Sequence, residues 1–223
     1  MANKKTFEGI DVSKFNGVID FQKVKKAGKS FVIMRAGGSC EGFFKDSKFE
    51  TNYKNAKAAG LNVGAYYIPG VNFKTAADGR ADAYRFMKQI KGKYFEMPVY
   101  LDIECQRASN RKGNTDAAIE FCRILEKAGY FVGIYASDKS GFESKLKLDR
   151  LKDFSKWVAN YGPDNGTEVN KPVKPSYVKT YAIHQYTQKG TCPGIYGKCD
   201  LDTMYEDLPK IIKSKHFNRP INS

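Results

Sequence analysis

Strand-like and helix-like segments alternate along the first two thirds of the chain. Runs rich in β-branched and aromatic residues, typical of buried strands, occur at residues 8–12, 30–36, 62–68, 97–104, 130–136, 156–161, 181–187 and 199–204. Segments of helical period follow the first four runs at about 20–28, 49–60, 75–91 and 114–129, with a weaker one near 142–153. Alternation of this kind predicts βαβ units and a parallel sheet.

The last third of the chain has a different pattern. Residues 162–178 are rich in Pro, Gly and Asn and have no helical period, so we expect loops to replace the later helices. Eight strands with about five helices predict an α/β fold, a modified TIM-like barrel of the form (β/α)5(β)3. No repeat or linker divides the chain. We therefore expect one barrel domain over residues 1–223, with a core at about 8–206 and a basic tail at about 210–223 that frays beyond the final helix.

Two carboxylates stand one residue apart at the end of the fourth strand-like run, which reads PVYLDIE at residues 98–104. Side chains alternate in direction along a strand, so Asp102 and Glu104 share one face while the Val, Leu and Ile residues of the run share the other. In a barrel the apolar outer face packs against helices, which directs the two acids toward the barrel axis. Their place at the strand's end puts them at the mouth, where the active sites of such barrels lie.

Three more acids have comparable positions. Asp11 ends the first run, and Asp200 and Asp202 lie in the eighth, which neighbours the first once a barrel closes. This arrangement predicts a ring of carboxylates around a cleft. Because crowding makes full ionisation costly, at least one carboxyl should keep its proton to a raised pKa and act as a general acid. Glu104, which has the longer side chain, is the candidate.

The acid pair also has two plainer interpretations: it could bind a divalent cation, or it could be a solvated strand end without a role. The two histidines, His184 and His216, have no HxH or HxxxH spacing, and no DxDxDG loop occurs, so we expect no metal site. His184 lies among apolar residues and is interpreted as structural.

The charge balance points to polyanionic partners without choosing among them. With 38 Lys and Arg against 24 Asp and Glu, the net charge of +14 would attract nucleic acid, anionic lipid or the acidic polymers of a bacterial wall.

No apolar run approaches the roughly 20 residues that cross a bilayer, so we expect no membrane insertion. The N-terminus lacks the apolar segment of a signal peptide, which favours synthesis in a cytoplasm. Five cysteines form no CxxC pair, and free thiols are favoured over a Cys192–Cys199 disulfide.

Several motifs follow one another in a characteristic order. They are EGIDVSKFNGVIDF, FVIMRAGGS, DSKFETNYKNAKAAGLNVGAYY, PVYLDIE, GIYAS, WVANY and HQYTQKG followed by GIYGKCDLD. In this combination, over about residues 8–206, the chain resembles the family 25 glycoside hydrolases, the lysozymes (muramidases) of phages, bacteria and some fungi. The resemblance implies an eight-stranded barrel with five helices that hydrolyses the β-1,4 bond between N-acetylmuramic acid and N-acetylglucosamine in peptidoglycan.

The resemblance also implies roles for particular residues. Glu104 corresponds to the catalytic acid and Asp102 to its partner carboxylate, with Asp11 and Asp200 as further acids of the catalytic site. The residues expected to bind the sugar are Tyr66, Tyr135, Trp157, Gln185 and Arg35. The resemblance favours retention of configuration assisted by the substrate's own N-acetyl group, and it implies no cofactor.

The chain departs from the family pattern at a few positions beside these residues. Tyr67 and Ile68 stand where the family often has His and Phe, His184 where it commonly has Trp, and Asp202 where it commonly has Asn. The acids themselves are intact. The departures therefore bear on subsite preference more than on activity.

The partners implied are bacterial peptidoglycan and anionic wall polymers, reached by a monomer that is made in the host cytoplasm and acts on the wall after release. Two other classes of function stay open from the sequence. One is an inactive or chitin-directed barrel that binds glycan, although an inactive relative would ordinarily have lost the acid at position 104. The other is a basic nucleic-acid binder, for which no recognised motif is present.

Overall fold

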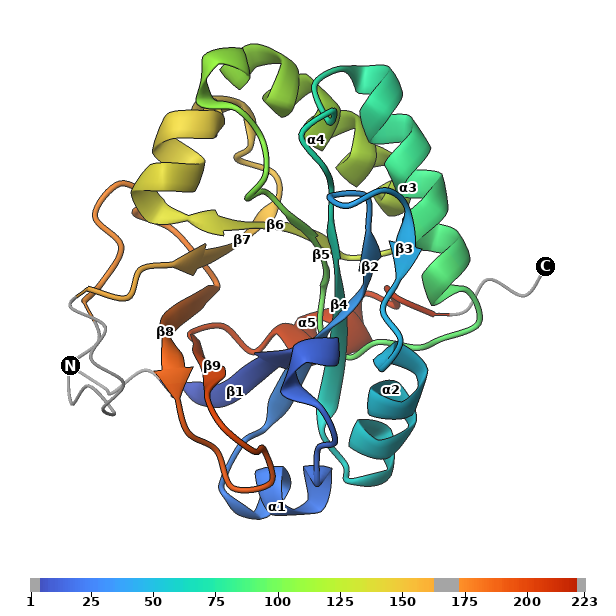
Figure 1. Cartoon of the computed structure of the whole chain (residues 1–223), viewed down its shortest axis with the longest axis vertical. Helices are drawn as coiled ribbons and strands as arrows, with labels where there is room; N and C mark the ends of the chain where they lie inside the picture. Colours follow the sequence, from blue (N-terminus) through green and yellow to red (C-terminus); the bar gives the residue numbers. More distant parts are fainter. Residues whose placement is uncertain (1–4, 163–172, 220–223) are drawn as a thin grey trace.

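The computed structural model describes residues 5–162 and 173–219, and its central feature is a closed β-barrel (Figure 1). The barrel strands are β1 (Phe7–Val12), β2 (Phe31–Gly38), β4 (Asn62–Ile68), β5 (Val99–Asp102), β6 (Val132–Ser137), β7 (Ser155–Ala159), β8 (Ile183–Gly190) and β9 (Cys199–Met204). They pair in the order β1, β9, β8, β7, β6, β5, β4, β2, and pairing of β1 with β2 closes the ring. The eight strands expected from the sequence are thus confirmed, and the short strand β3 (Phe44–Lys45), which pairs with the end of β2, is additional.

Strand β9 is the exception to the parallel arrangement, because it runs antiparallel to both of its neighbours, β1 and β8. The remaining neighbours in the barrel are parallel. Only residues 191–198 join β8 to β9. A connection this short suits an antiparallel pair, whereas a parallel pair needs a crossover of about a dozen residues or more. The fold is therefore a mixed barrel, and the beginning of β9, not its end, lies at the mouth.

Four helices match the segments of helical period in the sequence. They are α1 (Phe21–Lys26), α2 (Phe49–Ala58), α3 (Ala76–Ile90) and α4 (Arg111–Lys127). Thr75 and Asp78 form a reciprocal capping box at the start of α3. Gly129, with φ of 85°, follows α4 in the left-handed conformation that glycine adopts without strain.

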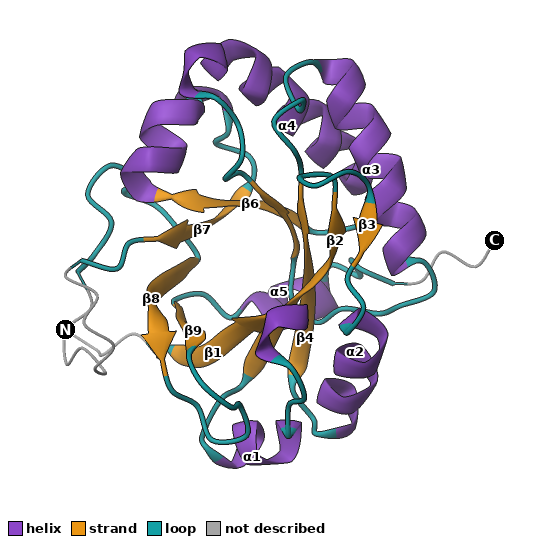
Figure 2. Cartoon of the chain, in the orientation of Figure 1, coloured by secondary structure: helices purple, strands orange, loops and turns teal. Residues whose placement is uncertain are grey.

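The fifth crossover, expected as a weak helix near 142–153, is irregular. It contains a π-helix at Asp138–Glu143 and a 3₁₀ turn at Leu148–Arg150. Beyond it, among the described residues, loops and no helices connect β7 to β8 and β8 to β9 (Figure 2). Most of the loop expected at 162–178 lies outside the described residues.

The core has two layers, one on each side of the barrel wall. Val99, Leu101 and Ile103 of the fourth strand-like run pack in the outer layer, where α3 and α4 lie side by side against the barrel (Figure 1). Tyr100 points the other way and packs inside the barrel with Trp157. The alternation expected from the sequence therefore holds, and it directs the next inward position, Asp102, toward the barrel axis.

The C-terminal segment does not fray but is held against the barrel as far as residue 219. Helix α5 (Leu208–Ser214) follows β9, and Leu208 packs with the interior cluster of the barrel. Asn218 is fully buried, donates its side-chain amide to the carbonyls of Phe95 and Met97, and accepts a hydrogen bond from the backbone N–H of Phe131. The expectation of a fraying tail is wrong for this stretch, because a single buried asparagine ties it to two loops. Residues 220–223 lie outside the described residues.

Among the described residues, no helix combines the length and apolar character needed to cross a membrane.

Candidate active site

The barrel brings the predicted acids to one end. Asp102 is the last residue of β5, and Glu104 follows two residues later. Asp11 of β1 pairs in register with Asp200 of β9. Because β9 is antiparallel, its second residue lies at the same end as the last residues of the parallel strands. The predicted ring of carboxylates is therefore present.

These acids line a cavity of about 210 Å³ at the mouth of the barrel. Its lining residues are Asp11, Tyr66, Asp102, Glu104, Tyr135, Trp157, Tyr161, Gln185, Gln188 and Asp200. Eight of these ten were predicted from the sequence. The other two, Tyr161 and Gln188, were not.

A chain of hydrogen bonds fixes one wall of the cavity. The hydroxyls of Tyr135 and Tyr161 both donate to Oε1 of Gln185, each at 2.6 Å. Nε2 of Gln185 in turn donates to Oδ2 of Asp11 at 2.5 Å. In this arrangement the amide oxygen accepts from both hydroxyls and the amide nitrogen donates to the carboxylate. One carboxylate oxygen of Asp11 is thus held in place by a network that spans three strands.

Aromatic rings form the floor of the cavity, and one of them is hydrogen-bonded to a buried acid, Asp202. Trp157 packs against Tyr135 with ring centroids 4.4 Å apart and against Tyr66 at 6.1 Å. Its indole Nε1 donates to Oδ1 of Asp202 at 2.8 Å, and Asp202 is fully buried. The indole plane is therefore fixed by both packing and a hydrogen bond.

Burial and mutual repulsion raise the pKa of the acids at this site. Burial raises the pKa of Asp102 well above its usual value, and the nearby Glu104 carboxylate raises it further. Burial also raises the pKa of Asp11, to which the charges of Asp200 and Asp202 add. Groups of this kind hold protons at a pH where ordinary carboxyls have lost them.

Glu104 differs from the other acids in its surroundings. Its side chain lies exposed at the rim, yet the protein atoms around it raise its pKa, while the positive charge of Lys145 lowers it. The ammonium group of Lys145 also donates a hydrogen bond to the backbone carbonyl of Glu104. A carboxyl with a raised pKa that still reaches solvent can exchange a proton with a bound molecule and with water.

The comparison with known families decides where this chain belongs. The model for "Glycosyl hydrolases family 25" matches residues 10–195. The chain belongs to glycosyl hydrolase family 25. The resemblance expected from the sequence is therefore confirmed.

Individual relatives agree with the family match. The autolytic lysozyme of Clostridium acetobutylicum is 28% identical over 202 residues, which cover 90% of this chain and 56% of that protein. The chain thus spans little more than half the length of this relative. Among solved structures, the CTP1L endolysin is 28% identical with a TM-score of 0.77, covering 93% of this chain and 70% of that one. The bacterial lysozyme from Streptomyces coelicolor has a TM-score of 0.75 at 24% identity, covering 96% and 100%, and shares the fold.

Within this family 25 barrel, Arg35 is the predicted site residue that does not line the cavity. Its Nε donates to Oδ2 of Asp46 at 2.8 Å, and its guanidinium lies 4.9 Å from the centre of the Phe15 ring. Its positive charge nevertheless acts on the site, because it lowers the pKa of Asp102 and so opposes burial. Arg35 is therefore a buried residue outside the lining of this cavity, paired with Asp46.

His184 is structural, as its apolar sequence context indicates. It is fully buried, and its Nε2 lies 2.9 Å from the carbonyl oxygen of Asn160. Burial lowers its pKa, so it is neutral near pH 7.

The two lining residues that were missed have different explanations. Tyr161 shares a face with Trp157 and Ala159, so extending the alternation by one more step past β7 would have found it. Gln188 follows a register shift in the pairing of β8 with β9 between Gln185 and Thr187. A bulge of this kind breaks the alternation of side chains and hides Gln188 from a sequence argument.

In residues 5–162 and 173–219, no three His, Cys, Asp or Glu side chains come together as a possible metal site.

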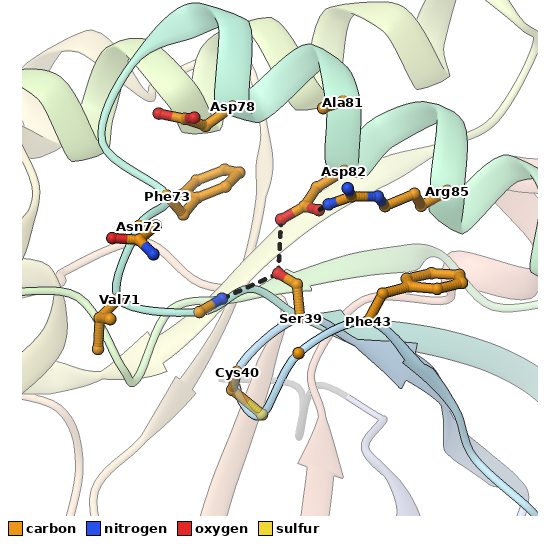
Figure 3. Close-up of a pocket in the computed structure, with 12 residues that line it drawn as sticks. Ser39, Cys40, Phe43, Val71, Asn72, Phe73, Asp78, Ala81, Asp82 and Arg85 are labelled. Carbon is orange, nitrogen blue, oxygen red and sulfur yellow. Dashed lines mark hydrogen bonds and ion pairs between the residues drawn. The ribbon is translucent and has the colours of Figure 1, made fainter.

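A larger cavity, of about 430 Å³, lies between the loop after β2, the loop after β4 and helix α3 (Figure 3). Asp82 is its central polar group: it accepts hydrogen bonds from Ser39 Oγ at 2.8 Å and from Arg85 Nη1 at 2.9 Å. The side chains of Phe43 and Val71 also line this cavity and are exposed to solvent. Cys40 also lines this cavity, and its sulfur is drawn in Figure 3.

Proposed function

We propose that this chain is an N-acetylmuramidase, a peptidoglycan hydrolase that cleaves the β-1,4 bond between N-acetylmuramic acid and N-acetylglucosamine. The observation that carries the proposal is the pairing of Glu104 at the rim with Asp102 inside the cavity, both with a raised pKa. Membership of family 25 and the similarity to curated lysozymes support it. The barrel acts in this proposal as a single catalytic domain.

In the proposed reaction, Glu104 is the general acid and then the general base. Its raised pKa keeps a proton available for the leaving glycosidic oxygen, and its exposure lets water reach the same carboxylate for the second step. General acid and base catalysis by a positioned side chain contributes about 10²–10⁴-fold to a rate.

Asp102 is proposed to act on the substrate's N-acetyl group. Its Oδ1 is buried and has no hydrogen-bond partner among the described residues, although the residue lines the cavity. A buried oxygen without a partner is costly, so an amide N–H that enters the cavity gains by donating to it. This bond would orient the acetamido group so that its carbonyl oxygen attacks the anomeric carbon, the substrate-assisted exception to the two-carboxylate scheme.

The remaining lining residues are proposed to hold the sugar. Tyr66, Tyr135 and Trp157 present ring faces and edges that suit the apolar faces of a pyranose. Gln185 and Asp11 form a fixed polar wall, and Asp200 lies beside them. Arg35 does not line the cavity, and its positive charge acts on Asp102 by lowering the pKa of that carboxyl.

The test is digestion of purified bacterial walls followed by analysis of the new reducing ends. Borohydride converts each new reducing-end sugar into its alditol, which acid hydrolysis then releases. We expect clearing of the walls and the alditol of muramic acid. The alditol of glucosamine would replace the proposal with a glucosaminidase, and binding to walls without clearing would replace it with a glycan-binding barrel.

The proposed wall partners also include anionic polymers, to which the net charge of +14 is complementary. Because salt screens charges over about 8–10 Å at physiological ionic strength, added salt should slow lysis of whole walls more than cleavage of a short neutral fragment. The measurement compares both rates between about 20 and 300 mM salt, a range over which the screening length falls several-fold. Equal slowing of the two rates would contradict the electrostatic part of the proposal.

A further inference from the structure

Two of the five cysteines differ from the others in accessibility. Cys40 and Cys105 are partly exposed, whereas Cys122, Cys192 and Cys199 are buried, and all five are free thiols. Cys105 directly follows Glu104 in the sequence. The accessible pair therefore lies where a change in its chemistry would reach the proposed catalytic acid.

The loops that carry the two thiols pack together at the end of β4. A Cβ atom at Gly70 would lie only 3.2 Å from the Cα of Cys40. The residue after Cys105, Gln106, donates its side-chain amide to the carbonyl of the same Gly70 at 2.9 Å. The Cys40 thiol also raises the pKa of Cys105, an effect that requires the two side chains to lie close to each other. Strands β2 and β5 are not neighbours, so this contact bridges the loops of two strands across a third.

The larger cavity gives small molecules access to Cys40, the first thiol of this pair. Cys40 lines the cavity of about 430 Å³, a volume in the range of small-molecule sites (Figure 3). Arg85 stands in the same cavity with about half of its side chain exposed, so it can receive the carboxylate of a peptide-like molecule.

We propose that Cys40 and Cys105 are a redox modification site, which low-molecular-weight disulfides such as glutathione disulfide convert into an intramolecular disulfide that impairs hydrolysis. The Cys40 thiolate attacks one sulfur of the small disulfide, giving a mixed disulfide and one released thiolate. The Cys105 thiolate then attacks the Cys40 sulfur and releases the second. The protein loses two protons and two electrons, and the small disulfide is reduced to two thiols.

The expected effect on hydrolysis follows from bond lengths. An S–S bond is about 2.05 Å long, shorter than any contact between two thiols, so closing it draws the loop of Cys105 toward that of Cys40. Glu104 is one peptide bond away, and a misplacement of about 1 Å can cost as much as about 10²-fold in rate. We therefore expect oxidation to lower the rate of hydrolysis by about ten-fold or more, and reduction to restore it.

The chemical test is to incubate the full chain with glutathione disulfide and to map its sulfur atoms. Burial raises the pKa of Cys40, and it raises that of Cys105 to about 11, so the exchange is run at about pH 8.5–9 to supply thiolate. We expect a mass loss of about 2 Da and a disulfide between tryptic peptides 36–45 and 94–107. A stable mixed disulfide on Cys40, a bond between Cys192 and Cys199 instead, or no reaction would each overturn the proposal.

The functional test uses Cys40→Ser, Cys105→Ser and the double variant as matched controls. Each should be as active as the reduced wild type and should keep its activity after treatment with glutathione disulfide. Loss of activity in the treated double variant, or full activity of the oxidised wild type, would remove the inhibitory effect. The activity readout rests on the proposed hydrolase function, but the disulfide mapping does not, so the two can fail separately.

Discussion

Two groups of carboxylates lie around the same cavity on nearly opposite sides of the barrel, and their surroundings differ. On the β5 side, Asp102 keeps a buried oxygen without a partner among the described residues, and Glu104 reaches the rim. On the β1 and β9 side, Asp11 accepts a hydrogen bond from Gln185, and Asp202 accepts one from Trp157.

The difference distinguishes carboxylates that are free to act on a substrate from carboxylates that stabilise the cavity wall. All four are acids whose pKa is raised by burial, so the pKa alone does not distinguish them. Access to the cavity together with unused hydrogen-bonding capacity does, because Asp102 lines the cavity with an oxygen that has no partner among the described residues, whereas Asp202, which also has one such oxygen, does not line the cavity. The comparison therefore predicts large kinetic effects from the β5 pair and mainly structural effects from Asp202.

The largest effect is expected for Glu104→Gln, which keeps the shape of the side chain but removes the proton. The rate of wall hydrolysis should fall by about 10³–10⁴-fold, near the upper end of what a general acid contributes. Thermal unfolding should be little changed, because the side chain is exposed at the rim. Glu143→Gln, at another exposed glutamate, is the matched control and should retain full activity. Substantial activity in Glu104→Gln would remove Glu104 from the role of acid.

A smaller but still large loss is expected for Asp102→Asn. The amide preserves the size of the buried side chain and its oxygen can still accept the substrate's N–H, but it cannot carry the negative charge that would strengthen this bond and stabilise developing positive charge. We expect kcat on a soluble glycan fragment to fall by about 10²-fold with a smaller change in KM, as for the loss of one electrostatic stabiliser. A change confined to KM would place Asp102 in ground-state binding and weaken the contrast between the two walls.

Strand alternation was enough to predict the β5 pair, because Asp102 and Glu104 depend only on which face of one strand is apolar. The direction of β9 could also have been predicted, since residues 191–198 are too few for a parallel crossover. The short strand β3, two residues long, gives no periodic signal.

Contacts formed in three dimensions could not be predicted in this way. Lys145 reaches Glu104 from a segment 41 residues away, and no local pattern marks that lysine among the others. Arg35 belongs to barrel strand β2, but its side chain pairs with Asp46 and is not among the residues that line the cavity. Sequence pattern thus predicted the acids that line the cavity, while the charges that act on them required the fold.

The pH profile can test how the rim acid is tuned. Hydrolysis needs Glu104 protonated, so activity should fall as the pH rises through its raised pKa. Lys145 lowers that pKa, and Lys145→Met should therefore shift the alkaline limb of kcat/KM to higher pH, by about half a unit to one unit, the usual effect of one nearby charge. Lys147→Met, two residues away and exposed, is the control and should leave the limb in place. A shift to lower pH would show that Lys145 acts on another group.

The smallest effect is expected for Asp202→Asn, on the wall opposite the reactive pair. The amide oxygen can still accept from Trp157, and its N–H₂ can donate toward Asp11, so activity should change by less than about three-fold if the residue only stabilises the wall.

The same variant should change stability in a pH-dependent way. Burial raises the pKa of Asp202 in the folded chain, so ionisation costs stability as the pH rises above the pKa of about 3.9 that the group has in the unfolded chain. At pH 7 the variant should therefore unfold about 2–4 °C higher than the wild type, the shift that about 1 kcal/mol produces in a chain of this size. The difference should vanish near pH 3.5, where the acid is protonated in both states. Asp149→Asn, at an exposed position, should show no such trend. A lower unfolding temperature at pH 7 would mean that the charge of Asp202 stabilises the wall. A loss of activity as large as that of Asp102→Asn would contradict the distinction between the two groups of carboxylates.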